Sequence, residues 1–113
     1  MITEEVKQYI EEHKLCSENL FNDCESFLEL LFAQGCCVDA VLWFEHVLIS
    51  EQKNSLGAGG YIDKANPEYM YAETNIYESE MKNKSIADVK EYIKSIIKKY
   101  PNNKLVPSFY IVD

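Results

Sequence analysis

The sequence predicts a single α+β domain over residues 1–113, with helices packed on a small, mostly antiparallel sheet. Apolar residues recur at helical spacing in three segments, 3–14, 17–32 and 85–100. Three other segments, 37–49, 69–77 and 105–112, contain the β-branched and aromatic residues that strands favour. The order of these segments lacks a regular strand–helix–strand alternation, which is typical of α+β proteins. A length of 113 residues with 47% hydrophobic content suits one core.

The first two segments predict amphipathic helices. In the first, Ile2, Val6, Tyr9 and Ile10 share one face, and Thr3 is available as the N-cap. The second is expected to begin at Ser17. Its apolar stripe comprises Leu20, Phe21, Cys24, Phe27, Leu28, Leu31 and Phe32. Gly35 predicts the end of this helix, because glycine readily takes the left-handed conformation that closes many helices.

The segment Cys37–Ile49 is interpreted as a buried strand. Strict alternation would place Val38, Ala40, Leu42, Phe44 and Leu48 on one side and Val41, Trp43, Val47 and Ile49 on the other. A helix beginning at Asp39 would bury most of the same residues, and periodicity alone does not separate the two. The content of Val, Ile, Trp and Phe favours the strand.

Residues 50–68 are polar and glycine-rich and end in Asn66-Pro67, so they predict a long connection. The next segment, Tyr69–Tyr77, alternates as a half-buried strand does. Its expected outer face holds Tyr69, Tyr71, Glu73, Asn75 and Tyr77, and its inner face holds Met70, Ala72, Thr74 and Ile76. The outer face is therefore expected to be rich in tyrosine.

The last third of the chain predicts a helix and a final strand. Ser85 and Asp88 resemble a capping box at the helix start. The buried stripe of this helix comprises Ile86, Val89, Tyr92, Ile93, Ile96, Ile97 and Tyr100. Pro101 ends the helix, and Pro107 indicates that the strand Leu105–Val112 begins there or lies at a sheet edge.

The charge balance argues against nucleic-acid binding. The chain carries 19 acidic and 11 basic residues, and every basic residue is a lysine. Arginine makes most of the two-point contacts to phosphates and guanine, so its absence removes the commonest tool of sequence recognition. Residues 1–34 and 35–81 each have a net charge of −6, whereas residues 82–113 have a net charge of +4. The acidic field therefore comes from the first two thirds and suits a basic protein partner.

The sequence also predicts a cytoplasmic protein with no membrane partner. Its longest apolar runs fall short of the ~20 residues that cross a bilayer. The acidic start lacks the basic and apolar regions of a signal peptide. In the cytoplasm the four cysteines are expected to be reduced thiols. These are Cys16, Cys24, Cys36 and Cys37.

No motif predicts a catalytic, cofactor or metal site. His13 and Cys16 lie three residues apart, but no second pair completes the four ligands of a structural zinc site. Cys37 and His46 lack an orienting signature for nucleophilic catalysis. The glycine-rich stretch 55–61 lacks the Gly-Lys-Ser/Thr ending of a phosphate-binding loop. We therefore expect no enzymatic turnover, no cofactor and no stoichiometric metal.

The segment from Tyr61 to Glu80 is the best candidate for a partner-binding surface, because tyrosine is enriched at protein interfaces and carboxylates attract a basic partner. The residues expected to contact a partner are Asp63, Glu68, Tyr69, Tyr71, Glu73, Tyr77 and Glu78. Two other interpretations compete with this one. Tyrosine is also an ordinary strand residue, and the glutamates of the first two helices form an alternative acidic surface.

The chain resembles the small acidic immunity proteins of bacterial polymorphic and contact-dependent growth inhibition toxin systems. The resemblance lies in the tracts Trp43–His46, Ser55–Asp63 and Tyr71–Thr74, together with one compact acidic domain. It implies a protein that neutralises a basic toxin domain, often a nuclease in such systems, by occluding its cleft. A phage or mobile-element inhibitor would need the same acidic surface. A small enzyme would instead bring Glu45, His46 and Glu73 together in a pocket.

Overall fold

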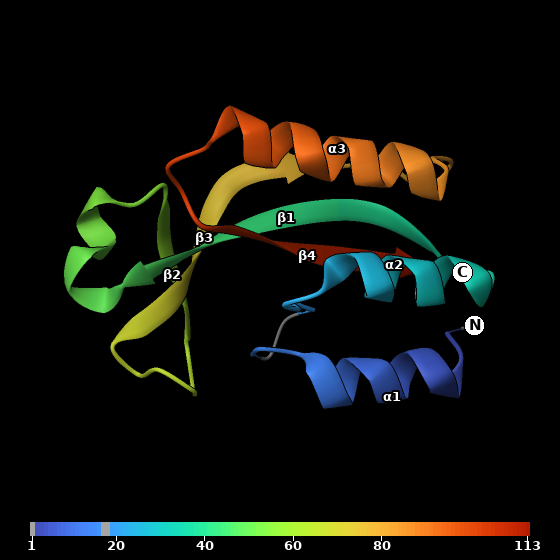
Figure 1. Cartoon of the computed structure of the whole chain (residues 1–113), viewed down its shortest axis with the longest axis horizontal. Coiled ribbons are helices and arrows are strands. Elements are labelled where there is room, and N and C mark those ends of the chain that lie inside the picture. The colour runs from blue at the N-terminus through green and yellow to red at the C-terminus, as the bar shows by residue number, and fades with distance from the viewer. Residues whose placement is uncertain (1, 17–18) are drawn as a thin grey trace.

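The computed structural model describes residues 2–16 and 19–113 and confirms the α+β class (Figure 1). A four-stranded sheet has the order β2-β3-β1-β4, and each neighbouring pair is antiparallel. The strands are β1 (Cys37–Leu48), β2 (Gly57–Ile62), β3 (Tyr69–Glu78) and β4 (Leu105–Val112). The helices are α1 (Glu4–His13), α2 (Cys24–Ala33), the 3₁₀-helix η1 (Ile49–Asn54) and α3 (Ile86–Lys99). No helix in the described ranges is long and apolar enough to cross a membrane.

The predicted caps of α1 and α3 are confirmed. The Thr3 hydroxyl accepts a hydrogen bond from the Val6 amide at 3.3 Å, and the Ser85 hydroxyl accepts one from the Asp88 amide at 3.2 Å. Each bond satisfies an amide that the first helical turn leaves unpaired. At the end of α2, Gly35 has a φ of +81°, which is the left-handed conformation expected there.

The predicted start of α2 is wrong. Ser17 lies outside the described residues, and the helix begins at Cys24, where the Asp23 carboxylate accepts from the Ser26 amide at 3.1 Å. Before the helix, Leu20 bridges to Ser108 and Phe21 bridges to Lys14. Consecutive residues of an extended chain point in opposite directions. Leu20 and Phe21 therefore enter two different apolar clusters rather than one helical stripe.

The strand interpretation of residues 37–49 is confirmed over Cys37–Leu48, but the expected division of its side chains is partly wrong. An irregularity between Val38 and Ala40 in the pairing with β4 shifts the alternation. Val38 therefore packs with Val41 and Trp43, on the side opposite to the one predicted. Ile49 belongs to η1 and is exposed.

The expectation that residues 50–68 form one long connection is also wrong, because this segment contains η1 and β2. Glycine lets β2 approach β3 closely. A Cβ atom at Gly60 would collide with the carbonyl oxygen of Tyr71, and one at Gly57 would lie 2.5 Å from that of Glu73. Glycine-rich sequence predicts a loop, yet here the missing side chains permit strand pairing.

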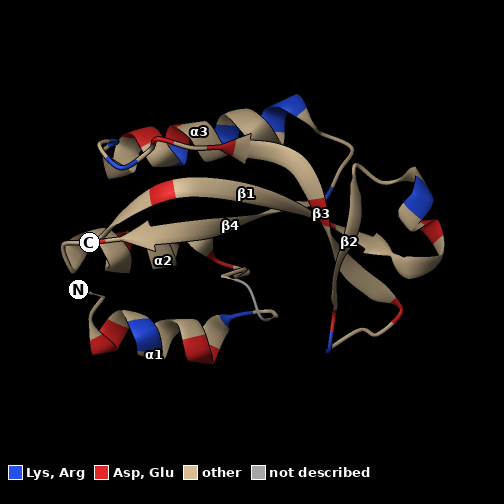
Figure 2. Cartoon of the chain, turned by 180° about the vertical axis from the view of Figure 1, so that it is seen from behind, with Lys and Arg blue, Asp and Glu red and all other residues tan. Residues whose placement is uncertain are grey.

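Two apolar clusters lie on the two faces of the sheet. The larger one, which we call the helix-side core, joins all three α-helices to residues such as Trp43 and Phe109. The smaller one, which we call the opposite-face cluster, contains Cys16, Leu20, Phe44 and Tyr71. Figure 2, which views the chain from behind, shows the strands on this opposite side. The segment before α2 thus covers part of a sheet face that the helices leave open.

Candidate functional site

The seven residues expected to contact a partner differ in accessibility. Glu68, Glu73, Tyr77 and Glu78 are exposed, and Tyr69 is half-buried. Asp63 and Tyr71 are only 6% and 5% exposed. The prediction of an exposed outer face is therefore wrong for Tyr71, because the opposite-face cluster encloses its ring. Asp63 is turned inward by hydrogen bonds to His46 and to the loop after β2.

Asp63 forms a buried pair with His46 of β1. Oδ2 of Asp63 lies 2.8 Å from Nε2 of His46, and Oδ1 accepts from the amides of Ala65 and Asn66 at 3.0 and 3.3 Å. Burial opposes ionisation of the carboxyl group, but these hydrogen bonds outweigh it and hold the pKa of Asp63 below its ordinary value of 3.8. The pair fastens the loop after β2 to the central strand.

Two tyrosines of β3 hold the imidazole of His46. The ring stacks on Tyr69 and Tyr71, with centroids 4.9 and 4.7 Å apart and interplanar angles of 18° and 29°. Burial, together with the nearby charge of Asp63, raises the pKa of Tyr71 to about 12. Tyr69 and Tyr71 therefore support the His46–Asp63 pair and offer little surface to a partner.

An exposed aromatic pair lies on the open part of the same sheet face. Tyr77 is paired with Leu42 and Tyr110 with Ala40, so both tyrosines flank β1. Their rings meet edge to face with centroids 6.2 Å apart, and they are 49% and 45% exposed. Glu73 is exposed on the same face, because it pairs with Phe44 of the opposite-face cluster. Glu78, the last residue of β3, pairs with Val41 of the helix-side core and therefore points to the face that α3 covers. We call Tyr77, Tyr110 and Glu73 the open-face surface.

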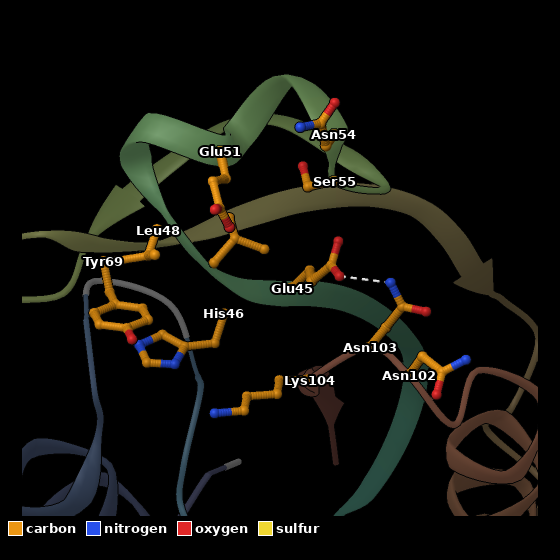
Figure 3. A pocket seen from close by; sticks show the side chains of 11 residues that line it. Glu45, His46, Leu48, Glu51, Asn54, Ser55, Tyr69, Asn102, Asn103 and Lys104 are labelled. Carbon is orange, nitrogen blue, oxygen red and sulfur yellow. Dashed lines mark hydrogen bonds between the residues drawn. The ribbon is translucent and has the colours of Figure 1, made fainter.

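A pocket of about 390 Å³ lies between the end of β1, η1 and the turn after α3 (Figure 3). Its lining includes Glu45, His46, Glu51, Tyr69 and Lys104. Glu45 is 5% exposed, and its carboxylate accepts from the Leu56 amide at 2.7 Å and from Nδ2 of Asn103 at 2.6 Å. Glu45 therefore ties the start of β2 and the turn after α3 to the central strand.

The three residues expected to converge in a small enzyme are not brought together in this pocket. Glu45 and His46 line it, whereas Glu73 is exposed and lines a different cavity beside Gly57 and Thr74. Both hydrogen bonds of Glu45 serve to hold neighbouring segments. The imidazole of His46 is oriented by Asp63, which the enzyme interpretation had not included.

Side chains of the types that bind metals do not cluster in the described structure. Within residues 2–16 and 19–113, no three His, Cys, Asp or Glu residues are placed to hold a metal ion together. None of the four cysteines forms a disulfide. Burial raises the pKa of Cys24, which disfavours its reactive thiolate.

Comparison with protein-family models, with curated proteins and with solved structures found no match to this chain.

Sequence reasoning missed Tyr110 although a signal was present. Alternation along 105–112 places Tyr110 with Val106 and Ser108, opposite the buried Phe109. No comparable signal pairs His46 with Asp63, because seventeen residues and a turn of unknown register separate them. Only the folded sheet relates these two positions.

Proposed function

We propose that this chain is a non-catalytic inhibitor that binds a basic toxin domain in the cytoplasm and occludes its cleft, as the small acidic immunity proteins do. The observation that carries the proposal is the open-face surface. It combines two exposed tyrosine rings with the exposed carboxylate of Glu73 on a sheet face that no α-helix of the described structure covers.

The tyrosine pair supplies the contact area. Tyr77 and Tyr110 are each almost half exposed, and their edge-to-face contact restrains both rings before a partner arrives. Restrained aromatic side chains bury much surface at a small entropic cost on binding. A lysine or arginine side chain is also attracted to the face of such a ring.

Glu73 on this surface, together with Glu78 at the adjoining end of β3, supplies the preference for a basic partner. Glu73 and Glu78 form no salt bridge with any residue that the structure describes. The lysines of α3 lie on a helix that packs on the other face of the sheet. Figure 2 shows charges of both signs along this helix. A net charge of −8 would accelerate encounter with a cationic domain.

The direct test is protection of cells. The chain is co-expressed with the toxin domain encoded beside its gene, and the two products are co-purified. We expect growth to be restored and a stable complex to form. If the cells die while both proteins are soluble and folded, the inhibitor proposal is wrong.

Variants locate the interface. Tyr77→Ala is expected to raise the dissociation rate about tenfold or more, as loss of a central aromatic contact does. The double variant Glu73→Gln, Glu78→Gln should mainly slow association, and added salt should reduce the difference from wild type.

A matched control removes two charges elsewhere. Glu11→Gln with Glu12→Gln makes the same change on the exposed face of α1 and should leave both rates close to those of wild type. If the α1 variant slows association and the β3 variant does not, the interface lies on the helices instead.

A further inference from the structure

Glu45 places a negative charge at the wall of the pocket shown in Figure 3 and has no salt-bridge partner among the described residues. The residue is 5% exposed, and its two hydrogen-bond donors, the Leu56 amide and the Asn103 side chain, are both neutral. No salt bridge joins Glu45 to another residue of the described chain. Neutral donors stabilise a carboxylate but leave its net charge in place.

The pocket adds further groups that accept hydrogen bonds. Glu51 and Asn54 from η1, Ser55 from the turn before β2 and Asn102 from the turn after α3 all line it. A carboxylate has about four acceptor positions, so the two bonds of Glu45 leave capacity for another donor. The groups around the opening therefore suit a ligand that carries positive charge and several N–H bonds.

Lys104 does not neutralise this end of the pocket. It is exposed, it forms no salt bridge with Glu45, and its side chain points away from Glu45 toward the His46 side in Figure 3. His46 in turn is engaged by the Asp63 carboxylate. The ammonium group of Lys104 and the imidazole of His46 thus lie toward one end of the lining, and the two glutamates lie toward the other.

We propose that this pocket receives the cationic end of a lysine or arginine side chain of the bound partner. This step rests on the proposed function for the source of that side chain, whereas the cation preference rests on Glu45 and Glu51 alone. The volume of about 390 Å³ is sufficient for one long side chain and lies within the usual range of small-ligand sites. The pocket would fix the register of a partner that the open-face surface attracts.

The cation preference is tested on the free, full-length protein with a small probe. N-acetyl-L-arginine methylamide is titrated against the ¹⁵N-labelled chain, and N-acetyl-L-citrulline methylamide serves as the neutral analogue of similar shape. The reporters are the Leu56 amide and the Asn103 side-chain amide, which both donate to Glu45. We expect saturable shifts of these two signals with the arginine probe and much weaker shifts with the citrulline probe.

Charge variants identify the groups responsible. Glu51 is exposed, so Glu51→Gln should fold normally and weaken binding of the arginine probe about two- to fivefold. Glu91→Gln makes the same charge change on α3, away from the pocket, and should leave the affinity unchanged. Glu45→Gln should abolish probe binding. If that variant fails to fold, the affinity of Glu51→Gln for the arginine probe still tests the proposal.

Two results would overturn the proposal: equal shifts of the reporters with both probes, or equal affinity of wild type and Glu51→Gln for the arginine probe. Failure of the inhibitor proposal has a different signature. In that case the probe binds and Glu51→Gln weakens it, yet the chain does not protect cells from the neighbouring toxin domain.

Discussion

His46 and Asp63 meet across the sheet with 2.8 Å between Nε2 and Oδ2, and Asp63 is almost fully buried. His46 belongs to the central strand, whereas Asp63 directly follows the edge strand β2. The amide of Asp63 also donates to the carbonyl of Tyr69 at 3.1 Å, at the start of β3. One residue thus connects β1, the end of β2 and the start of β3, and the turn that carries Glu68 depends on it.

Replacing Asp63 by Asn should destabilise the fold by about 1–3 kcal/mol near neutral pH, because the charged acceptor of His46 is lost from a buried site. The free energy of unfolding is measured with urea. Glu68→Gln, an exposed change in the same turn, is the control and should cost less than about 0.5 kcal/mol. Equal stability of Asp63→Asn and wild type would mean that the pair contributes nothing.

The advantage of Asp63 over Asn should also depend on pH. Its pKa is lower in the folded chain than its ordinary value of 3.8, so the folded state favours the ionised form. This contribution is fully present above the unfolded pKa and is lost as pH falls through the folded pKa. Urea unfolding of both proteins from pH 7 to below pH 3 should show their difference shrinking only in the acidic part of that range.

The raised pKa of Tyr71 should make the fold less stable at alkaline pH. Its pKa rises from 10.0 to about 12 on folding, so between these values the folded state holds a proton that the unfolded state has released. Stability then falls as pH rises, by about 1 kcal/mol near pH 11. Tyr71→Phe keeps the buried ring and should lose less stability than wild type between pH 9 and pH 11. An equal loss of stability in the two proteins would contradict the assignment of this pH dependence to Tyr71.

Gly60→Ala should detach β2 from β3. Gly60 has a φ of +121°, and an added methyl group would collide with the Tyr71 carbonyl oxygen. We expect a loss of about 2 kcal/mol or more and faster hydrogen exchange of the β2 amides. Gly59→Ala is the matched control, since its φ is +68° but nothing lies within 4 Å of the added atom. Its cost should be about 1 kcal/mol.

Local pattern predicted the elements that depend on neighbouring residues. Thr3 and Ser85 cap helices because a hydroxyl can reach an amide three residues ahead, and this geometry needs no distant contact. The strands β1 and β3 were predicted because a continuous run of β-branched and aromatic residues suits a pleated, buried surface. The glycine-rich β2 was missed because its strand character depends on the backbone of β3 beside it.

The candidate site was predicted only in part for the same physical reason. Sequence alone placed Glu73, Tyr77 and Glu78 on β3, and the exposure of Glu73 and Tyr77 follows from the alternation of a half-covered strand. Glu78 points to the other face and is exposed at the end of the strand. The burial of Tyr71 and Asp63 was decided by the segment before α2 and by His46, which are distant in sequence. The irregularity between Val38 and Ala40 determines the face of the sheet to which Val38 points. It depends on the register between strands, which no local pattern specifies. The sequence by itself thus determined the spacing of apolar residues in helices and strands, the helix caps and the acidic charge. The tertiary structure decided which of the predicted site residues reach the surface.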